Sequence, residues 1–198
     1  LGSGEAFRKL WQAWRDSREH HDLQHTPGIT LETYPDYSPV QVRTGVLAML
    51  GELEEGTWWS LSSFTAQVKA QHPDLLRTAG EYDAWFIKDA DGEEFLRGFE
   101  YWDAVEGALL RYLITGPLHW LGFLDLAVPE EQAAVSAFRR SKWADPLLGD
   151  RPPAVEERGK EQVQIRSMGE IRVTKRVPQR VRYQLARFCQ WRPIVSES

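Results

Sequence analysis

The sequence contains a single cysteine, Cys189, among 198 residues. One thiol cannot form an intrachain disulfide, and no cysteines and histidines are paired at the spacing of a structural zinc site. Disulfide frameworks and zinc fingers are therefore excluded. We expect a protein of a reducing compartment, and hence a cytoplasmic location.

Long apolar runs are also missing. No run approaches the ~18 apolar residues that a membrane-spanning helix requires. The first residues, LGSGEAFRKLWQAW, lack the basic-then-apolar order of a signal peptide and lack an initiator methionine. We expect a fragment of a longer protein that makes no membrane contact.

Motifs that carry catalysis are absent as well. The chain has no Gly-rich phosphate loop and no G-x-S-x-G elbow. Cys189 falls on the apolar side of an expected helix, where a thiol is inert. We therefore expect no enzymatic activity from this chain, no cofactor and no metal.

Histidines are few, and three of the five lie in the segment HHDLQH. His21 and His25 would share a helix face near Asp22, which leaves open an enzyme that uses a metal there. No third and fourth ligand can be placed, so an exposed helix end is the simpler interpretation. His119, inside the apolar segment LHWLG, is expected to be a hydrogen-bonded structural residue.

What the sequence does contain is enough for a sizeable core, since 42% of its residues are hydrophobic and nine are tryptophans. Its net charge of −5 hides an uneven distribution. Residues 1–150 hold 13 Lys and Arg against 24 Asp and Glu, whereas residues 151–198 hold 11 against 5. We expect the C-terminal part to contact a polyanion or to dock on an acidic protein surface.

The middle of the chain has the element order of a winged helix. Hydrophobic spacing, caps and turn residues predict these elements in order: a helix over 40–55, a strand over 57–61, a helix over 62–72, a hairpin around Asp91 and Gly92 as an insertion, a third helix from Trp102, two wing strands over 123–128 and 134–138, and a closing helix over 143–148. Gly56 is expected to cap the first of these helices.

Two flanking regions complete the expected α+β, mainly helical architecture. An amphipathic helix over 5–23 and an ordered loop form an N-terminal segment, 1–39, ahead of the winged-helix domain, 40–148. Residues 149–161 combine Pro, Gly and charge and are predicted to be a linker. Beyond them, a hairpin turning at Gly169 and a helix starting at Pro178 form a small basic module, 162–198.

The third helix is poorly suited to reading DNA. A groove-reading helix presents Arg, Lys, Asn or Gln to phosphates and base edges. The charged groups of this helix are Asp103, Glu106 and Arg111, so carboxylates outnumber guanidinium groups. Leu110 and Ile114 make its second side apolar, and we expect that side to face a protein neighbour, with the helix buried on two sides.

The last helix carries the candidate binding surface. A helical wheel places Val181, Leu185 and Phe188 on a core face. Charged and aromatic groups gather on the opposite side, where they could hold phosphates and stack a base. A protein partner, or packing on the acidic body of this chain, fits the same residues. The candidate residues for binding nucleic acid or a partner are Lys175, Arg176, Arg180, Tyr183, Arg187 and Trp191.

Two segments resemble a known family: EYDAWFIKDADGEEFLRGFEYWDAVEGALLRYLITGPLHWLGFLDLA and IRVTKRVPQRVRYQLARFCQW. They look like the winged-helix region that precedes the N-terminal domain of XPB-type DNA helicases in large bacterial proteins, and the similarity spans residues 40–192. GPLHWLG and RYQLARF are its most characteristic pieces. The resemblance implies a helicase-associated accessory region in DNA repair or transcription, without motor motifs or catalytic residues. The alternative is a protein-interaction scaffold without direct DNA contact.

Overall fold

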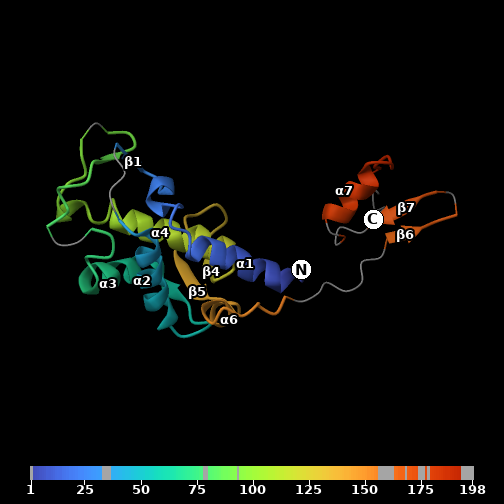
Figure 1. Ribbon diagram of the computed structural model, residues 1–198, viewed down its shortest axis with the longest axis horizontal. Helices are drawn as coiled ribbons and strands as arrows, with labels where there is room; N and C mark the ends of the chain where they lie inside the picture. The colour runs from blue at the N-terminus through green and yellow to red at the C-terminus, as the bar shows by residue number, and fades with distance from the viewer. Residues whose placement is uncertain are drawn as a thin grey trace. The chain divides into compact units, whose positions relative to one another are not determined.

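The computed structural model describes residues 2–32, 37–77, 80–92, 94–155, 163–167, 169–173, 177 and 179–192. The chain divides into two compact units, Leu1–Ala154 and Val155–Ser198 (Figure 1). The point of division lies inside the segment 149–161, which the sequence predicts to be a linker. More of the described residues lie in helices than in strands, so the fold is α+β and richer in helix than in strand.

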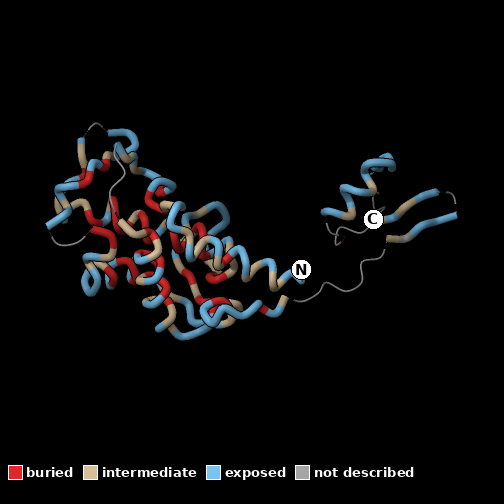
Figure 2. Tube along the Cα trace, viewed as in Figure 1, coloured by how far each residue is buried: buried red, intermediate tan, exposed pale blue. Residues whose placement is uncertain are grey.

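The first unit combines helices with short strands. Its helices are α1 (Ser3–Arg15), α2 (Pro39–Gly51), α3 (Leu61–Gln71), α4 (Glu106–Thr115), α5 (Pro117–Trp120) and α6 (Ala144–Leu148), with 3-10 turns η1 (Asp22–His25) and η2 (Phe99–Tyr101). Its strands are β1 (Ile29–Leu31), β2 (Trp59–Ser60), β3 (Ile87–Asp89), β4 (Leu124–Ala127) and β5 (Ala137–Arg140). Figure 2 shows buried residues running through the interior of this unit.

An antiparallel sheet of three strands has β5 at its centre, between β2 and β4. Phe138 of β5 lies opposite Trp59 on one side and Leu126 on the other. Its side chain is fully buried and meets the ring of Phe64 in α3 edge-on, with ring centroids 5.2 Å apart. The predicted pairing of the strands over 123–128 and 134–138 is confirmed by β4 and β5, although β5 starts at Ala137 and continues to Arg140.

Capping residues explain where two helices begin. The Ser38 hydroxyl accepts a hydrogen bond from the Gln41 backbone N–H at the start of α2. Ser60 caps α3 in the same way, so the helix begins at Leu61, one residue earlier than predicted. The prediction that Gly56 caps α2 is wrong, because the helix ends at Gly51.

The first helix is shorter than predicted, ending at Arg15 instead of Leu23. Arg43 of α2 supplies the reason, since its guanidinium donates to the carbonyl oxygens of Trp14, Ser17 and His20. The carbonyl groups at and beyond the helix end therefore accept hydrogen bonds from the Arg43 guanidinium and not from N–H groups of a further helical turn. The chain is free to turn there and continues into η1.

A strand occurs within the predicted loop before α2. β1 pairs antiparallel with β3, placing Thr30 opposite Lys88. The hairpin predicted around Asp91 and Gly92 is reduced to a single bridge between Lys88 and Phe95. β3 therefore takes its main partner from the N-terminal segment rather than from its neighbour in sequence.

α4 is buried on both sides, as predicted. Leu109 and Leu113 on one side and Leu110 and Ile114 on the other are each at most 1% exposed. The protein neighbour expected for Leu110 and Ile114 belongs to this unit, because both sides of α4 are covered within it. η1 packs against α4, and the N-terminal segment also reaches the start of β4, where α1 stacks Trp11 on Phe123 with ring centroids 5.1 Å apart.

The second unit holds a hairpin and a helix. β6 (Val163–Ile165) pairs antiparallel with β7 (Ile171–Val173), and α7 (Gln179–Ala186) follows. Gly169 turns the hairpin with a φ of 74°, a conformation that glycine adopts without strain. The predicted hairpin and helix are confirmed, whereas the predicted helix start, Pro178, lies outside the described residues. Among the described helices of both units, none is long and apolar enough to cross a membrane.

Candidate nucleic-acid interface

The surface of α7 carries arginine and aromatic side chains. Arg180 and Arg187 are exposed, and Tyr183 is 66% exposed. Val181 and Leu185, the predicted core face, are only half-buried. Because no residue of α7 is fully buried, the helix rests on a narrow apolar side and presents its other sides to solvent.

Two aromatic residues lie differently from their predicted places. Phe188 was assigned to the core face, but its side chain is 73% exposed. Phe188 lies beyond α7, which ends at Ala186, so a helical wheel does not predict the direction of its side chain. For the same reason Trp191 does not continue the face of Arg180 and Tyr183. It lies instead under Arg182, whose guanidinium carbon is 5.7 Å from the ring centroid.

Arg182 is therefore a member of this surface that the sequence interpretation missed. We call the exposed residues Arg180, Arg182, Tyr183, Arg187, Phe188 and Trp191 the α7 surface. The i, i+3 spacing places Arg180 and Tyr183 on one side of α7, and Arg187 is the first residue after the helix. Lys175 and Arg176, the remaining predicted site residues, lie outside the described residues.

The charge of the α7 surface is not balanced locally. Between Ile171 and Arg192 the sequence has seven Lys and Arg and no Asp or Glu. The carboxylate that the structure describes in this unit, Glu170, pairs with Arg172 at 3.2 Å and lies 3.9 Å from Arg166. Arg187, the first residue after α7, donates to the Gln184 side chain at 3.3 Å. Such a set of guanidinium groups attracts a polyanion.

The charged groups of the third helix face the interior of the first unit or bond to it. Glu106, the first residue of α4, is fully buried and accepts from Arg77 at 2.6 and 2.8 Å. Asp103 pairs with Lys69 at 2.7 Å. Arg111 is exposed and donates to the Asp103 carbonyl oxygen at 2.7 Å. These bonds tie the charged groups of the third helix to neighbouring parts of the first unit, instead of leaving them to contact a DNA groove.

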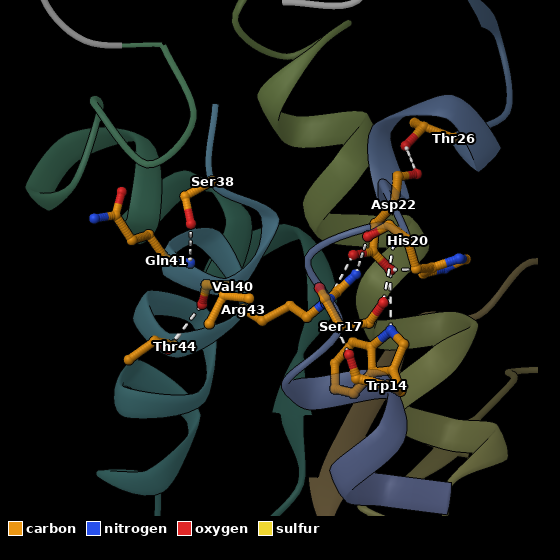
Figure 3. Close-up of polar contacts among 10 residues, drawn as sticks. All are labelled: Trp14, Ser17, His20, Asp22, Thr26, Ser38, Val40, Gln41, Arg43 and Thr44. Carbon is orange, nitrogen blue, oxygen red and sulfur yellow. Dashed lines mark hydrogen bonds and ion pairs between the residues drawn. The ribbon is translucent and has the colours of Figure 1, made fainter. Parts of the chain in front are cut away.

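The histidine segment is part of the N-terminal fold. Asp22 is 3% exposed, and its carboxylate accepts from Trp14 Nε1 at 3.0 Å and from Arg43 Nε at 2.7 Å (Figure 3). The rings of His20 and His25 stack with centroids 4.9 Å apart, and burial lowers the pKa of His20. Over the described residues, no group of three metal-ligating side chains is found.

His119 bears out its predicted role in part. Its Nδ1 lies 3.0 Å from the Leu124 carbonyl oxygen, so the ring is hydrogen-bonded to the first residue of β4. The side chain is nevertheless exposed, as is the neighbouring Trp120, at 68%. The bond connects α5 with the sheet.

An acidic groove of about 720 Å³ runs beside α2 in the first unit. Gly45, Ala48 and Met49 contribute to its wall, and Trp85 closes one part of it. Its lining includes three carboxylates and neither lysine nor arginine: Glu52, Asp74 and Glu81. This groove repels phosphate and suits a cationic ligand.

Comparisons with known proteins add no residues to either surface. Protein-family models, curated proteins and solved structures were compared with this chain, and none of them matches it.

Proposed function

We propose that this chain is a non-catalytic accessory region of a nucleic-acid-handling protein and that it contacts nucleic acid through its second unit. The α7 surface carries the proposal, because its arginines lack carboxylate partners among the described residues and its rings are exposed. Guanidinium groups neutralise phosphates and release counterions. Exposed rings stack on bases.

We also propose that the first unit is a winged helix that serves as a scaffold. The order α2, β2, α3, α4, β4, β5 and the sheet order β2-β5-β4 support it, since helix, strand, two helices and a two-stranded wing define that arrangement. The burial of α4 argues for the scaffold role. The resemblance to the region associated with XPB-type helicases belongs to this proposal and would place the parent protein in DNA repair or transcription.

Salt-dependent binding tests the nucleic-acid contact. Fluorescence anisotropy of a labelled oligonucleotide should give an affinity that falls linearly with salt on logarithmic axes, over about 50 to 200 mM. Arg180→Ala combined with Arg187→Ala should weaken binding and flatten the salt dependence. Lys9→Ala with Arg18→Ala removes two exposed cations from the first unit and should leave both unchanged. Absence of binding at low salt, or unchanged binding by the α7 variant, would contradict the proposal.

A second function, docking of a basic protein segment, is favoured by the acidic groove. Its carboxylates and the acidic composition of residues 1–150 complement a cationic helix. Calorimetric titration with an arginine-rich helical peptide checks this. Glu52→Gln with Glu81→Gln should weaken binding, whereas Glu130→Gln with Glu131→Gln, exposed elsewhere, should not. Peptide binding without oligonucleotide binding would make the chain an interaction scaffold.

A further inference from the structure

We infer that the α7 surface binds single-stranded nucleic acid in preference to duplex, with bases stacked on Tyr183 and Trp191. The inference rests on the proposed nucleic-acid contact and names its ligand class. Three rings are exposed within a short stretch of chain: Tyr183 by 66%, Phe188 by 73% and Trp191 by 48%. Binding to phosphates alone does not require this much exposed aromatic area.

The rings are available for stacking. No other ring of the described residues packs on Tyr183 or Phe188. Trp191 has the Arg182 guanidinium over its ring, and such a cation on an aromatic face leaves room for a base on the opposite face. Aromatic rings prefer a flat π-system as a partner, and every nucleobase offers one.

A duplex would contact the guanidinium groups of this surface but not its rings. Its bases are stacked on one another, so a protein reaches base edges, sugars and phosphates but not base faces. The guanidinium groups would be neutralised while Tyr183, Phe188 and Trp191 stayed in water. An unpaired strand presents phosphates and free base faces together.

The arrangement along the helix fits a single strand. Arg180 and Tyr183 lie three residues apart on one side of α7, and Arg187 follows directly after the helix end at Ala186, so cation, ring and cation alternate along the chain. Arg182 with Trp191 repeats the pairing of cation and ring beyond that side. A strand that crosses both groups would meet phosphate contacts and stacking contacts in alternation.

Three labelled probes of equal length separate stacking from phosphate binding: a single-stranded oligothymidylate, a duplex, and a single-stranded oligomer with abasic sugars. The full chain is titrated with each at one salt concentration. We expect the oligothymidylate to bind about 10-fold or more tightly than the abasic strand and than the duplex, because stacking on the two rings together contributes at least that factor.

Two double variants separate the contribution of the rings from that of the arginines. Tyr183→Ala with Trp191→Ala should weaken oligothymidylate binding about 10-fold or more, keep its salt slope, and abolish the preference over the abasic strand. Arg180→Ala with Arg187→Ala should lower the single-strand salt slope by about 1.4. Trp120→Ala removes an exposed ring from the first unit and should change neither quantity. Circular dichroism confirms that each variant is folded.

The outcomes distinguish this inference from the proposed function. Equal affinity for all three probes, or tighter duplex binding, would overturn the single-strand preference and leave nucleic-acid binding intact. A preference that survives Tyr183→Ala with Trp191→Ala would overturn the stacking assignment. Failure to bind any probe at low salt would overturn both the inference and the proposed function.

Discussion

Arg77 and Glu106 form a fully buried ion pair in which Arg77 Nε and Nη2 donate to the two carboxylate oxygens at 2.6 and 2.8 Å. The remaining Arg77 nitrogen, Nη1, donates to the carbonyl oxygens of Tyr82 and Leu96 at 3.3 and 3.2 Å. One side chain therefore joins the segment after α3, the insertion before α4, and the first turn of α4.

Removing one partner of this pair should destabilise the first unit strongly. Arg77→Met leaves the Glu106 carboxylate buried without a counter-charge, which costs roughly 3 to 5 kcal/mol of unfolding free energy. Arg77→Met combined with Glu106→Leu should recover much of that loss, because both charges are gone. Urea unfolding of the three proteins measures the difference. A single variant within about 1 kcal/mol of wild type would show that the pair has little role.

Arg43 should hold the N-terminal segment in place. Arg43→Ala removes the ion pair to the buried Asp22 and the bonds to three carbonyl groups, so we expect α1 and η1 to open first (Figure 3). Hydrogen exchange should then accelerate over residues 3–25. Arg18→Ala removes a nearby exposed cation and should leave the exchange rates unchanged. Uniform acceleration across the whole first unit would contradict a local role.

Stability should fall on mild acidification because burial lowers the pKa of His20. A histidine with a lowered folded-state pKa binds fewer protons in the folded than in the unfolded chain. Its contribution is therefore constant above the unfolded pKa of about 6.5 and is lost as the pH drops below it. Melting temperatures between about pH 8 and pH 5 measure this. His20→Gln should reduce the decline, and an identical pH profile would exclude His20 as its source.

Gly122 should tolerate a side chain less well than Gly56. Both have positive φ, 77° and 75°, so alanine is strained to the same degree at either position. A Cβ at Gly122 would also lie 2.5 Å from the Trp143 ring, whereas one at Gly56 meets open space. We expect Gly56→Ala to cost about 1 kcal/mol and Gly122→Ala about 1 to 3 kcal/mol more. Equal losses in thermal unfolding would show that Trp143 moves freely.

Local patterns in the sequence were enough for several elements. The pairing of β4 with β5 follows from their apolar residues, and the two-sided burial of α4 follows from Leu110 and Ile114. β1 could not be predicted in this way. Its three residues are too few to show alternation, and its partner β3 lies far along the chain.

The buried charges were missed for a different reason. Glu106 and Asp22 are of a type that is normally exposed, and their arginine partners lie 29 and 21 residues away. In the candidate site, the helical wheel selected Arg180, Tyr183 and Arg187 but misplaced Trp191. The error came from the helix end at Ala186, a boundary that hydrophobic spacing does not define.

The enclosure of α4 by its own chain has a consequence for how relatives of this protein would diverge. A helix buried on two sides is selected there for volume, whereas a helix that contacts a groove is selected for hydrogen-bonding groups. Leu110 and Ile114 should therefore exchange only with apolar residues of similar size wherever η1 is retained against α4. Relatives that carry arginines on this helix should lack the N-terminal segment that covers it. The two features should therefore occur together.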